Sequence, residues 1–165
     1  MGKKWDGAEF FRMMAANEKA VGALYRQVAT QAAFGGKFFE NLAADEDRHF
    51  NIYTALLHKF EGTDTLVVDV TEEQEVYLKL LIENNWMKDA DKMLAEAAKL
   101  KDKDEIYALA ERAERDAVLF VEELIDLYPQ LQPEEFQVVL HEEKNHLKQV
   151  PVSYTHLTLP TIYSV

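Results

Sequence analysis

The chain of 165 residues contains no cysteine, which excludes disulfides, thiolate metal ligands and cysteine nucleophiles. It has no apolar run near the roughly 20 residues of a membrane span, and none follows the basic residues at its start, as a signal peptide requires. Lysine and arginine are few, 18 against 30 acids, and the net charge of -12 disfavours nucleic acid and anionic membranes as partners. These absences predict a soluble, cytoplasmic, single-domain protein whose charge concentrates cations.

Residues 39–60 have an apolar residue at every third or fourth position, which predicts a helix with one buried face. Glu46 and His49 interrupt that face in its middle. They are three residues apart and therefore lie about one turn apart on the same side of a helix. Since burying an unpaired carboxylate costs several kcal/mol, either a counter-charge lies in the core or the helix is misread.

The same pattern recurs in three other stretches, each with a glutamate at the matching position. These inward acids are Glu18, Glu114 and Glu143, and the last stretch adds His146 three residues after its acid. Four helices therefore each offer one carboxylate, and two of them add an imidazole. Two divalent cations would cancel the charge of four carboxylates. The mixture with imidazole favours iron or manganese over calcium or magnesium.

Two antiparallel helices that meet at their inward acids should turn midway between those acids. For the first pair the midpoint is residue 32, close to Gly35 and Gly36, and we expect the first helix to run from residue 6 or 7 to residue 33. For the second pair the midpoint lies beside Pro129, and proline is poorly tolerated inside a helix. The sequence thus predicts two helical hairpins with their acids at one level.

Residues 61–104 connect the two predicted hairpins. We expect a loop at 61–65, an extended stretch at 66–70, a capping box at Thr71 and Gln74 that opens a helix, and a second helical run at 89–100. Asp102 or Asp104 would cap the next helix. This connection is long enough to travel the length of a bundle. The predicted fold is an all-α four-helix bundle of two antiparallel helix pairs with a long helical crossover between helices 2 and 3, and in this connectivity it resembles ferritin-like bundles.

Residues 151–165 contain no Asp, Glu, Lys or Arg, although the preceding 150 residues contain 48 of them. This shift in composition resembles translated adaptor or vector sequence and predicts a foreign or disordered tail. The alternative is a β-prone appendage that packs on the bundle. We therefore assign residues 1–150 to the bundle and treat residues 151–165 separately.

Residues 7–150 resemble the ferritin-like superfamily and, more narrowly, the di-iron domain of rubrerythrins. The resemblance depends on Glu18 followed by Tyr25, on the two Glu-x-x-His pairs, and on Glu111 followed by Glu114. It implies a site for two iron ions, with manganese or mixed metals as alternatives. The implied ligands are Glu18, Glu46, His49, Glu111, Glu114, Glu143 and His146. Which of Glu111 and Glu114 has which role stays open, and for Glu111 a surface position is the alternative.

The resemblance also implies reduction of hydrogen peroxide, with Glu46 and Glu143 bridging the metals and Tyr25 donating a hydrogen bond to a ligand or to bound oxygen. Rubrerythrins carry a rubredoxin-like domain with four cysteines, which this chain lacks. Electrons would therefore come from an external donor such as a rubredoxin, and we expect a homodimer. Two alternatives remain: a ferritin-like ferroxidase or iron-storage protein that uses dioxygen, and a metal-free helical interaction module.

Overall fold

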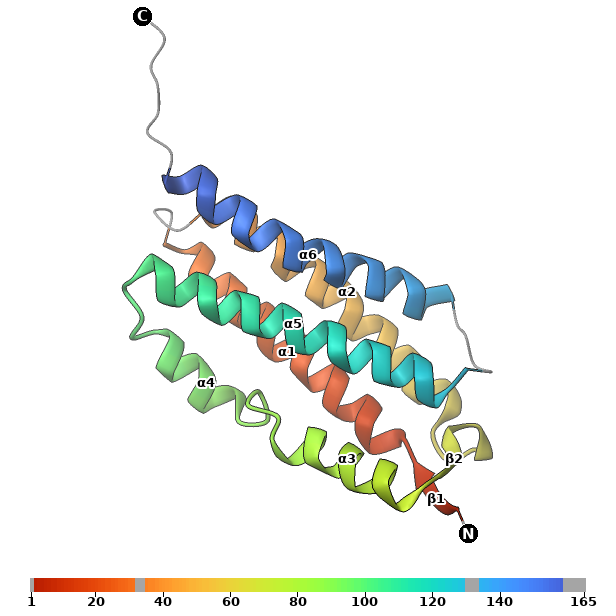
Figure 1. Ribbon diagram of the computed structural model, residues 1–165. Helices are drawn as coiled ribbons and strands as arrows, with labels where there is room; N and C mark the ends of the chain where they lie inside the picture. The colour runs from red at the N-terminus through yellow and green to blue at the C-terminus, as the bar shows by residue number, and fades with distance from the viewer. Residues whose placement is uncertain (1, 32–34, 130–133, 159–165) are drawn as a thin grey trace, which may run out of the picture.

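The computed structural model describes residues 2–31, 35–129 and 134–158, which form a bundle of helices (Figure 1). The four long helices are α1 (Ala8–Ala29), α2 (Gly36–Phe60), α5 (Lys103–Leu127) and α6 (Glu134–Thr158). α1 packs antiparallel on α2, and α5 packs antiparallel on α6. α2 and α5 run in the same direction, as the predicted crossover requires. The predicted all-α bundle of two antiparallel helix pairs is confirmed.

The crossover follows one side of the bundle (Figure 1). It contains η2 (Asp64–Leu66), β2 (Val67–Val70), α3 (Glu72–Glu83) and α4 (Ala90–Ala97). The predicted capping box is present, because Gln74 N donates to Thr71 Oγ1 at 3.1 Å and Thr71 N donates to Gln74 Oε1 at 2.8 Å. Asp102 caps α5 by accepting from the backbone N–H of Asp104 at 2.8 Å. The helix caps that the sequence predicts at the start of α3 and of α5 are therefore present.

Glycine is required at two positions in the turn between α1 and α2. Gly35 has a φ of 87°, in the left-handed region that favours glycine. A Cβ on Gly36 would lie 2.8 Å from the carbonyl oxygen of Ala29. α1 ends at Ala29, earlier than predicted, because the chain then tightens into a turn in which Gln31 N donates to the Val28 carbonyl at 2.9 Å. The expected end at residue 33 and most of the second turn lie outside the described residues.

The predicted extended stretch is β2, and it pairs with a strand that the sequence did not predict. β1 (Lys3–Asp6) runs antiparallel to β2. The chain then passes Gly7, where an added Cβ would overlap the hydroxyl of Tyr128. That hydroxyl donates to the carbonyl of Leu66 at 2.9 Å. The start of the chain, the crossover and the end of α5 are thereby held together.

α6 continues into the uncharged segment, with Pro151 inside the helix. The Tyr107 hydroxyl of α5 lies 2.9 Å from Ser153 Oγ, and Lys103 Nζ donates to the carbonyl of Tyr154 at 3.0 Å. Residues 151–158 are thus helical, where we expected a disordered segment with a β-prone appendage as the alternative, and Ser153 and Tyr154 contact α5. Residues 159–165 lie outside the described part, and a foreign origin of the segment stays a prediction.

The core is aromatic on either side of a polar middle. Phe11, Tyr53 and Phe136 pack together on one side of that middle, and the rings of Tyr25 and Phe39 pack on the other. All five side chains are buried. Apolar packing thus isolates the middle of the bundle from both ends. Among the described helices, none combines the length and apolar character needed to cross a membrane.

Candidate metal centre

Four carboxylates and two imidazoles meet in the polar middle of the bundle. Each long helix contributes one glutamate there, because these acids occupy inward positions of the helical repeat. The six residues are at most 3% exposed, and they are Glu18, Glu46, His49, Glu114, Glu143 and His146. The predicted inward positions of all six are confirmed. They form two overlapping groups, each of four side chains whose ligand atoms lie within 4.8 Å of one another.

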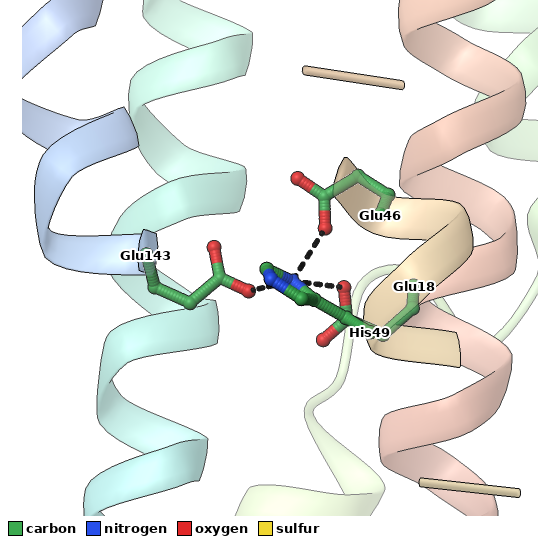
Figure 2. Close-up of side chains that lie close together, drawn as sticks. All are labelled: Glu18, Glu46, His49 and Glu143. Atoms are coloured by element: carbon green, nitrogen blue, oxygen red, sulfur yellow. Dashed lines mark ion pairs between the residues drawn. The ribbon is translucent and has the colours of Figure 1, made fainter. Parts of the chain in front are cut away.

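The first group surrounds His49 (Figure 2). Its Nδ1 atom lies 2.8 Å from Glu143 Oε1, 3.4 Å from Glu46 Oε2 and 3.8 Å from Glu18 Oε2. Two ligands about 2.1 Å from a common ion and at right angles lie about 3 Å apart. The spacings in this group therefore suit four donors around one cation.

The second group surrounds His146 in the same way. Its Nδ1 atom lies 3.2 Å from Glu114 Oε2, 3.3 Å from Glu143 Oε2 and 3.5 Å from Glu46 Oε1. Glu46 and Glu143 thus belong to both groups, each with one oxygen toward each histidine. The two imidazole rings are 5.9 Å apart between centroids. The arrangement is two neighbouring sites that share two carboxylates.

The atoms that face the centre are unpaired. Among the described residues, no hydrogen-bond partner is found for Nδ1 of either histidine, for either oxygen of Glu143, for Glu46 Oε1 or for Glu114 Oε2. Buried polar atoms without partners cost about 1–3 kcal/mol each. A cation would satisfy all of them at once. The donor set therefore fits a pair of metal ions.

The other ring nitrogen of each histidine is paired across the bundle. His49 Nε2 lies 2.8 Å from Glu142 Oε2 on α6, and His146 Nε2 lies 3.1 Å from Asp45 Oδ2 on α2. An ionised carboxylate can only accept, so each Nε2 carries a proton, and each Nδ1 faces the centre, where loss of its own proton would free a lone pair for a cation. Arg48 contacts both acids, at 3.0 Å from Asp45 and 2.8 Å from Glu142. These contacts orient the imidazoles as ligands.

Burial and crowded charge shift the pKa values of the cluster. Burial raises the pKa of Glu18 well above its ordinary value, and it raises the pKa of Glu114 to about 8. Burial by itself lowers the pKa of each imidazole, but the surrounding carboxylates outweigh it, so His49 and His146 have raised pKa values. In the metal-free protein, protons therefore supply the positive charge that the carboxylates need. Metal binding would release those protons.

Two buried tyrosines lie beside the cluster. The Tyr25 hydroxyl donates to Glu114 Oε1, the contact with a ligand that the sequence led us to expect. The Tyr53 hydroxyl has no hydrogen-bond partner among the described residues, although its ring is fully buried. Tyr25 thus fixes one carboxylate of the second group.

The structure does not bring Glu111 into the cluster. Its side chain is 48% exposed and forms an ion pair with Arg115 one turn along α5. Glu114 faces inward because it lies on the buried stripe of α5, whereas Glu111 lies at the edge of that stripe on the solvent side. The metal role expected for Glu111 is therefore not supported, and the surface alternative is the observed one. α5 contributes one acid to the centre.

Sequence reasoning missed the two acids that hold the histidines. Asp45 directly precedes Glu46, and Glu142 directly precedes Glu143. In both motifs an acidic residue precedes the Glu-x-x-His sequence. This repeated acidic pair is the sequence signal from which the two contacts could have been predicted. Neighbouring helical positions point about 100° apart, so the first acid of each pair faces the adjoining helix rather than the centre.

Comparisons of the chain with models of protein families, with curated proteins and with solved structures found no match. What the fold and the site define is a helical bundle with a buried carboxylate and histidine cluster that can hold metal ions.

Proposed function

We propose that this protein is a ferritin-like, non-haem di-iron carboxylate protein that reduces hydrogen peroxide with electrons from an external donor. One observation carries the proposal. Glu46 and Glu143 each direct one oxygen toward His49 and the other toward His146. A carboxylate with its two oxygens directed toward two sites is suited to bridge two metal ions, which lie about 3.5–4 Å apart in such sites.

The donor set supports iron as the metal. Two helices each offer a glutamate, and two offer a Glu-x-x-His pair, which is the arrangement of ferritin-like di-iron and di-manganese proteins. Carboxylate with imidazole suits iron or manganese, and a site without thiolate disfavours soft ions. Two bound ferrous ions would supply the two electrons that convert hydrogen peroxide and two protons into two molecules of water.

The protein's own groups hold, orient and shield this centre. Tyr25 fixes Glu114, and Asp45 and Glu142 orient the imidazoles. Because the chain has no cysteine for a rubredoxin-like domain, the proposal includes an external electron donor such as a rubredoxin. It also includes a homodimer in the cytoplasm as the working form.

The second candidate function is ferroxidase or iron handling with dioxygen as oxidant. In rubrerythrins, the third long helix carries a Glu-x-x-Glu pair that plainer ferritin-like sites lack. Here only Glu114 of the corresponding pair on α5 faces the cluster, and Glu111 is exposed. The exposure of Glu111 therefore favours the ferroxidase. A closed shell in solution would support this alternative, whereas a dimer supports the peroxidase. Light scattering separates the two.

Metal analysis of protein purified without chelator tests the centre. We expect two equivalents of iron in the unchanged protein and loss of both in Glu46→Ala and in Glu143→Ala, since each bridges both sites. Glu111→Ala is the matched control, because it removes a carboxylate from the surface of α5 and should keep two equivalents. Iron that binds only the folded state must also raise the melting temperature. Unchanged stability with ferrous iron would support the metal-free interaction module instead.

The reaction is tested separately from the metal. Iron-loaded protein is given hydrogen peroxide and a reduced rubredoxin, and the oxidation of the donor is followed. Peroxide-dependent turnover supports the peroxidase. Consumption of dioxygen by added ferrous iron, without peroxide turnover, would favour the ferroxidase.

A further inference from the structure

A small cavity lies against the metal cluster between α1 and α5. Its volume of about 10 Å³ is room for about one water molecule. Glu18, Glu46 and Glu114 form its inner wall, and Ala113 and Ala117 of α5 are small enough to leave the space open. The cavity lies beside ligands of both groups. It is therefore placed where a small reactant would meet the centre.

Met87 covers this cavity. It belongs to the connection between α3 and α4, lines the cavity and is 3% exposed. The neighbouring residues Asn85 and Trp86 line an open pocket of about 530 Å³ on the outer side. Three consecutive residues thus separate the outer pocket from the cavity. A methionine side chain is flexible enough to move aside.

Hydrogen bonds hold this cover in place. Asn85 Nδ2 donates to Asn17 Oδ1 on α1 at 2.8 Å, and Met87 N donates to Asn85 Oδ1 at 3.3 Å. Trp86 Nε1 donates to Asp116 Oδ2 on α5 at 2.7 Å. The cover therefore spans the gap between α1 and α5 and is tied to both helices.

The side-chain amide nitrogen of Asn17 is a donor group that no described residue accepts from. Its Oδ1 atom is engaged by Asn85, so its amide orientation is fixed by that bond. Its Nδ2 atom is buried and has no hydrogen-bond partner among the described residues, while the residue is 4% exposed and lines the cavity. The other polar groups of the cavity are carboxylates, which accept. The cavity thus offers one donor opposite several acceptors.

We propose that this cavity is the binding site for hydrogen peroxide, with Asn17 Nδ2 donating to the bound molecule and Met87 covering it; this rests on the proposed function. Peroxide has two oxygen atoms that accept and two hydrogens that donate to carboxylates, whereas dioxygen is a poor hydrogen-bond acceptor. Because the cavity has room for about one water molecule, hydrogen peroxide with its two oxygens enters with a small shift of Met87, whereas a bulky hydroperoxide requires a much larger one. Asn17 therefore selects for an acceptor and Met87 for small size.

Binding is tested with azide on protein loaded with cobalt(II), by titrating the cobalt absorption bands. Azide accepts a hydrogen bond, so Asn17→Ala should weaken its binding about tenfold. Trp86→Phe is the matched control, because it removes the bond of the cover to Asp116 but leaves the bond between Asn85 and the Asn17 amide; its azide affinity should not fall. Equal affinities in all three proteins, or equal weakening in both variants, would overturn the role of Asn17.

Size selection is tested by comparing hydrogen peroxide with tert-butyl hydroperoxide as substrates of iron-loaded protein. Met87→Ala should raise kcat/KM for the bulky substrate relative to hydrogen peroxide about tenfold or more. Met93→Ala, in the outer pocket, is the control and should leave the ratio unchanged. An unchanged ratio in Met87→Ala, or an effect confined to dioxygen consumption, would overturn the proposal.

Metal content distinguishes failure of the proposed peroxide site from failure of the proposed metal centre. Two cobalt equivalents in every variant, with unchanged azide binding, would remove the peroxide site and leave the proposed metal centre intact. Failure of the unchanged protein to bind cobalt would remove both.

Discussion

His49 on α2 is held by Glu142 on α6 at 2.8 Å, and the reciprocal contact joins His146 on α6 to Asp45 on α2 at 3.1 Å. Each acid directly precedes a shared glutamate of the candidate metal centre. The helices α2 and α6 therefore orient each other's imidazoles. The two contacts cross between the hairpins, so the centre belongs to neither hairpin alone.

Removal of either outer acid should weaken metal binding. We expect Asp45→Ala and Glu142→Ala each to lower iron or cobalt affinity about 10- to 100-fold, because the imidazole loses the partner that fixes its orientation. Competition with a chromophoric chelator measures this. Asp47→Ala is the control, since Asp47 lies on α2 but pairs with Arg26 at the surface. Affinities equal to that of the control would contradict the role of the crossing contacts.

Two buried tyrosines should respond differently to loss of their hydroxyls. Tyr25→Phe leaves Glu114 Oε1 without its donor and should lower the free energy of unfolding by about 1–3 kcal/mol. Tyr53→Phe removes a buried hydroxyl that has no partner among the described residues, so stability should be unchanged or slightly higher. Denaturant unfolding of the metal-free proteins measures both. Equal losses in the two variants would show that the Tyr25 contact contributes nothing specific.

The metal-free protein should become less stable as the pH rises from about 6 to 9. The raised pKa values of His49 and His146 stabilise the fold fully below their unfolded value of about 6.5, and this stabilisation is lost as the pH rises toward the folded values. Glu114, with its pKa raised to about 8, and Glu18 keep their protons in the folded state above the pH at which the unfolded chain loses them, so they also lower stability as the pH rises toward their folded pKa values. All four shifts therefore act in the same direction.

The melting temperature across this pH range measures the effect. Glu114→Gln removes one ionisation and should flatten the dependence, and metal should largely abolish it because cations replace the protons. The lowered pKa of Glu46 acts below its ordinary value of 4.5, outside this range. A melting temperature of the metal-free protein that rises from pH 6 to 9 would contradict the charge balance derived for the cluster.

Deletion of residues 151–165 should lower stability modestly and spare the metal centre. The deletion removes the contacts of Ser153 and Tyr154 with α5, including the packing of the Tyr154 ring on Tyr107 at 5.5 Å between centroids. Thermal unfolding and metal content of the shortened chain measure the two effects. Tyr154→Ala in the full chain is the matched comparison. Loss of metal on deletion would show that this segment supports the centre.

The sequence predicts the four long helices and the inward side chains because both follow from one local rule. A seven-residue apolar repeat fixes which face is buried, and Glu18, Glu46, Glu114 and Glu143 lie on that face. Helix caps are also local, so the roles of Thr71 and Asp102 were predictable from a few neighbouring residues. Glu111 lies beside the stripe, where the repeat does not decide between burial and exposure.

The remaining features depend on contacts between distant segments. β1 becomes a strand because Lys3 through Asp6 meet β2 more than 60 positions away, and nothing in four residues specifies that pairing. The contacts of Asp45 and Glu142 depend on how the hairpins dock. The cover over the small cavity likewise depends on Asn85 reaching Asn17 on another helix. These features depend on the three-dimensional arrangement of the helices and cannot be read from local sequence.

Because α2 and α6 each supply the acid that contacts the other's histidine, docking of the hairpins is an all-or-none event. If one helix slipped by a single turn, about 5.4 Å, both imidazoles would leave their acids together and both shared glutamates would leave one of the two candidate sites. A misregistered bundle would thus hold neither ion of the proposed pair. Metal content would then serve as a readout of correct assembly, since only the native alignment creates a place for the pair.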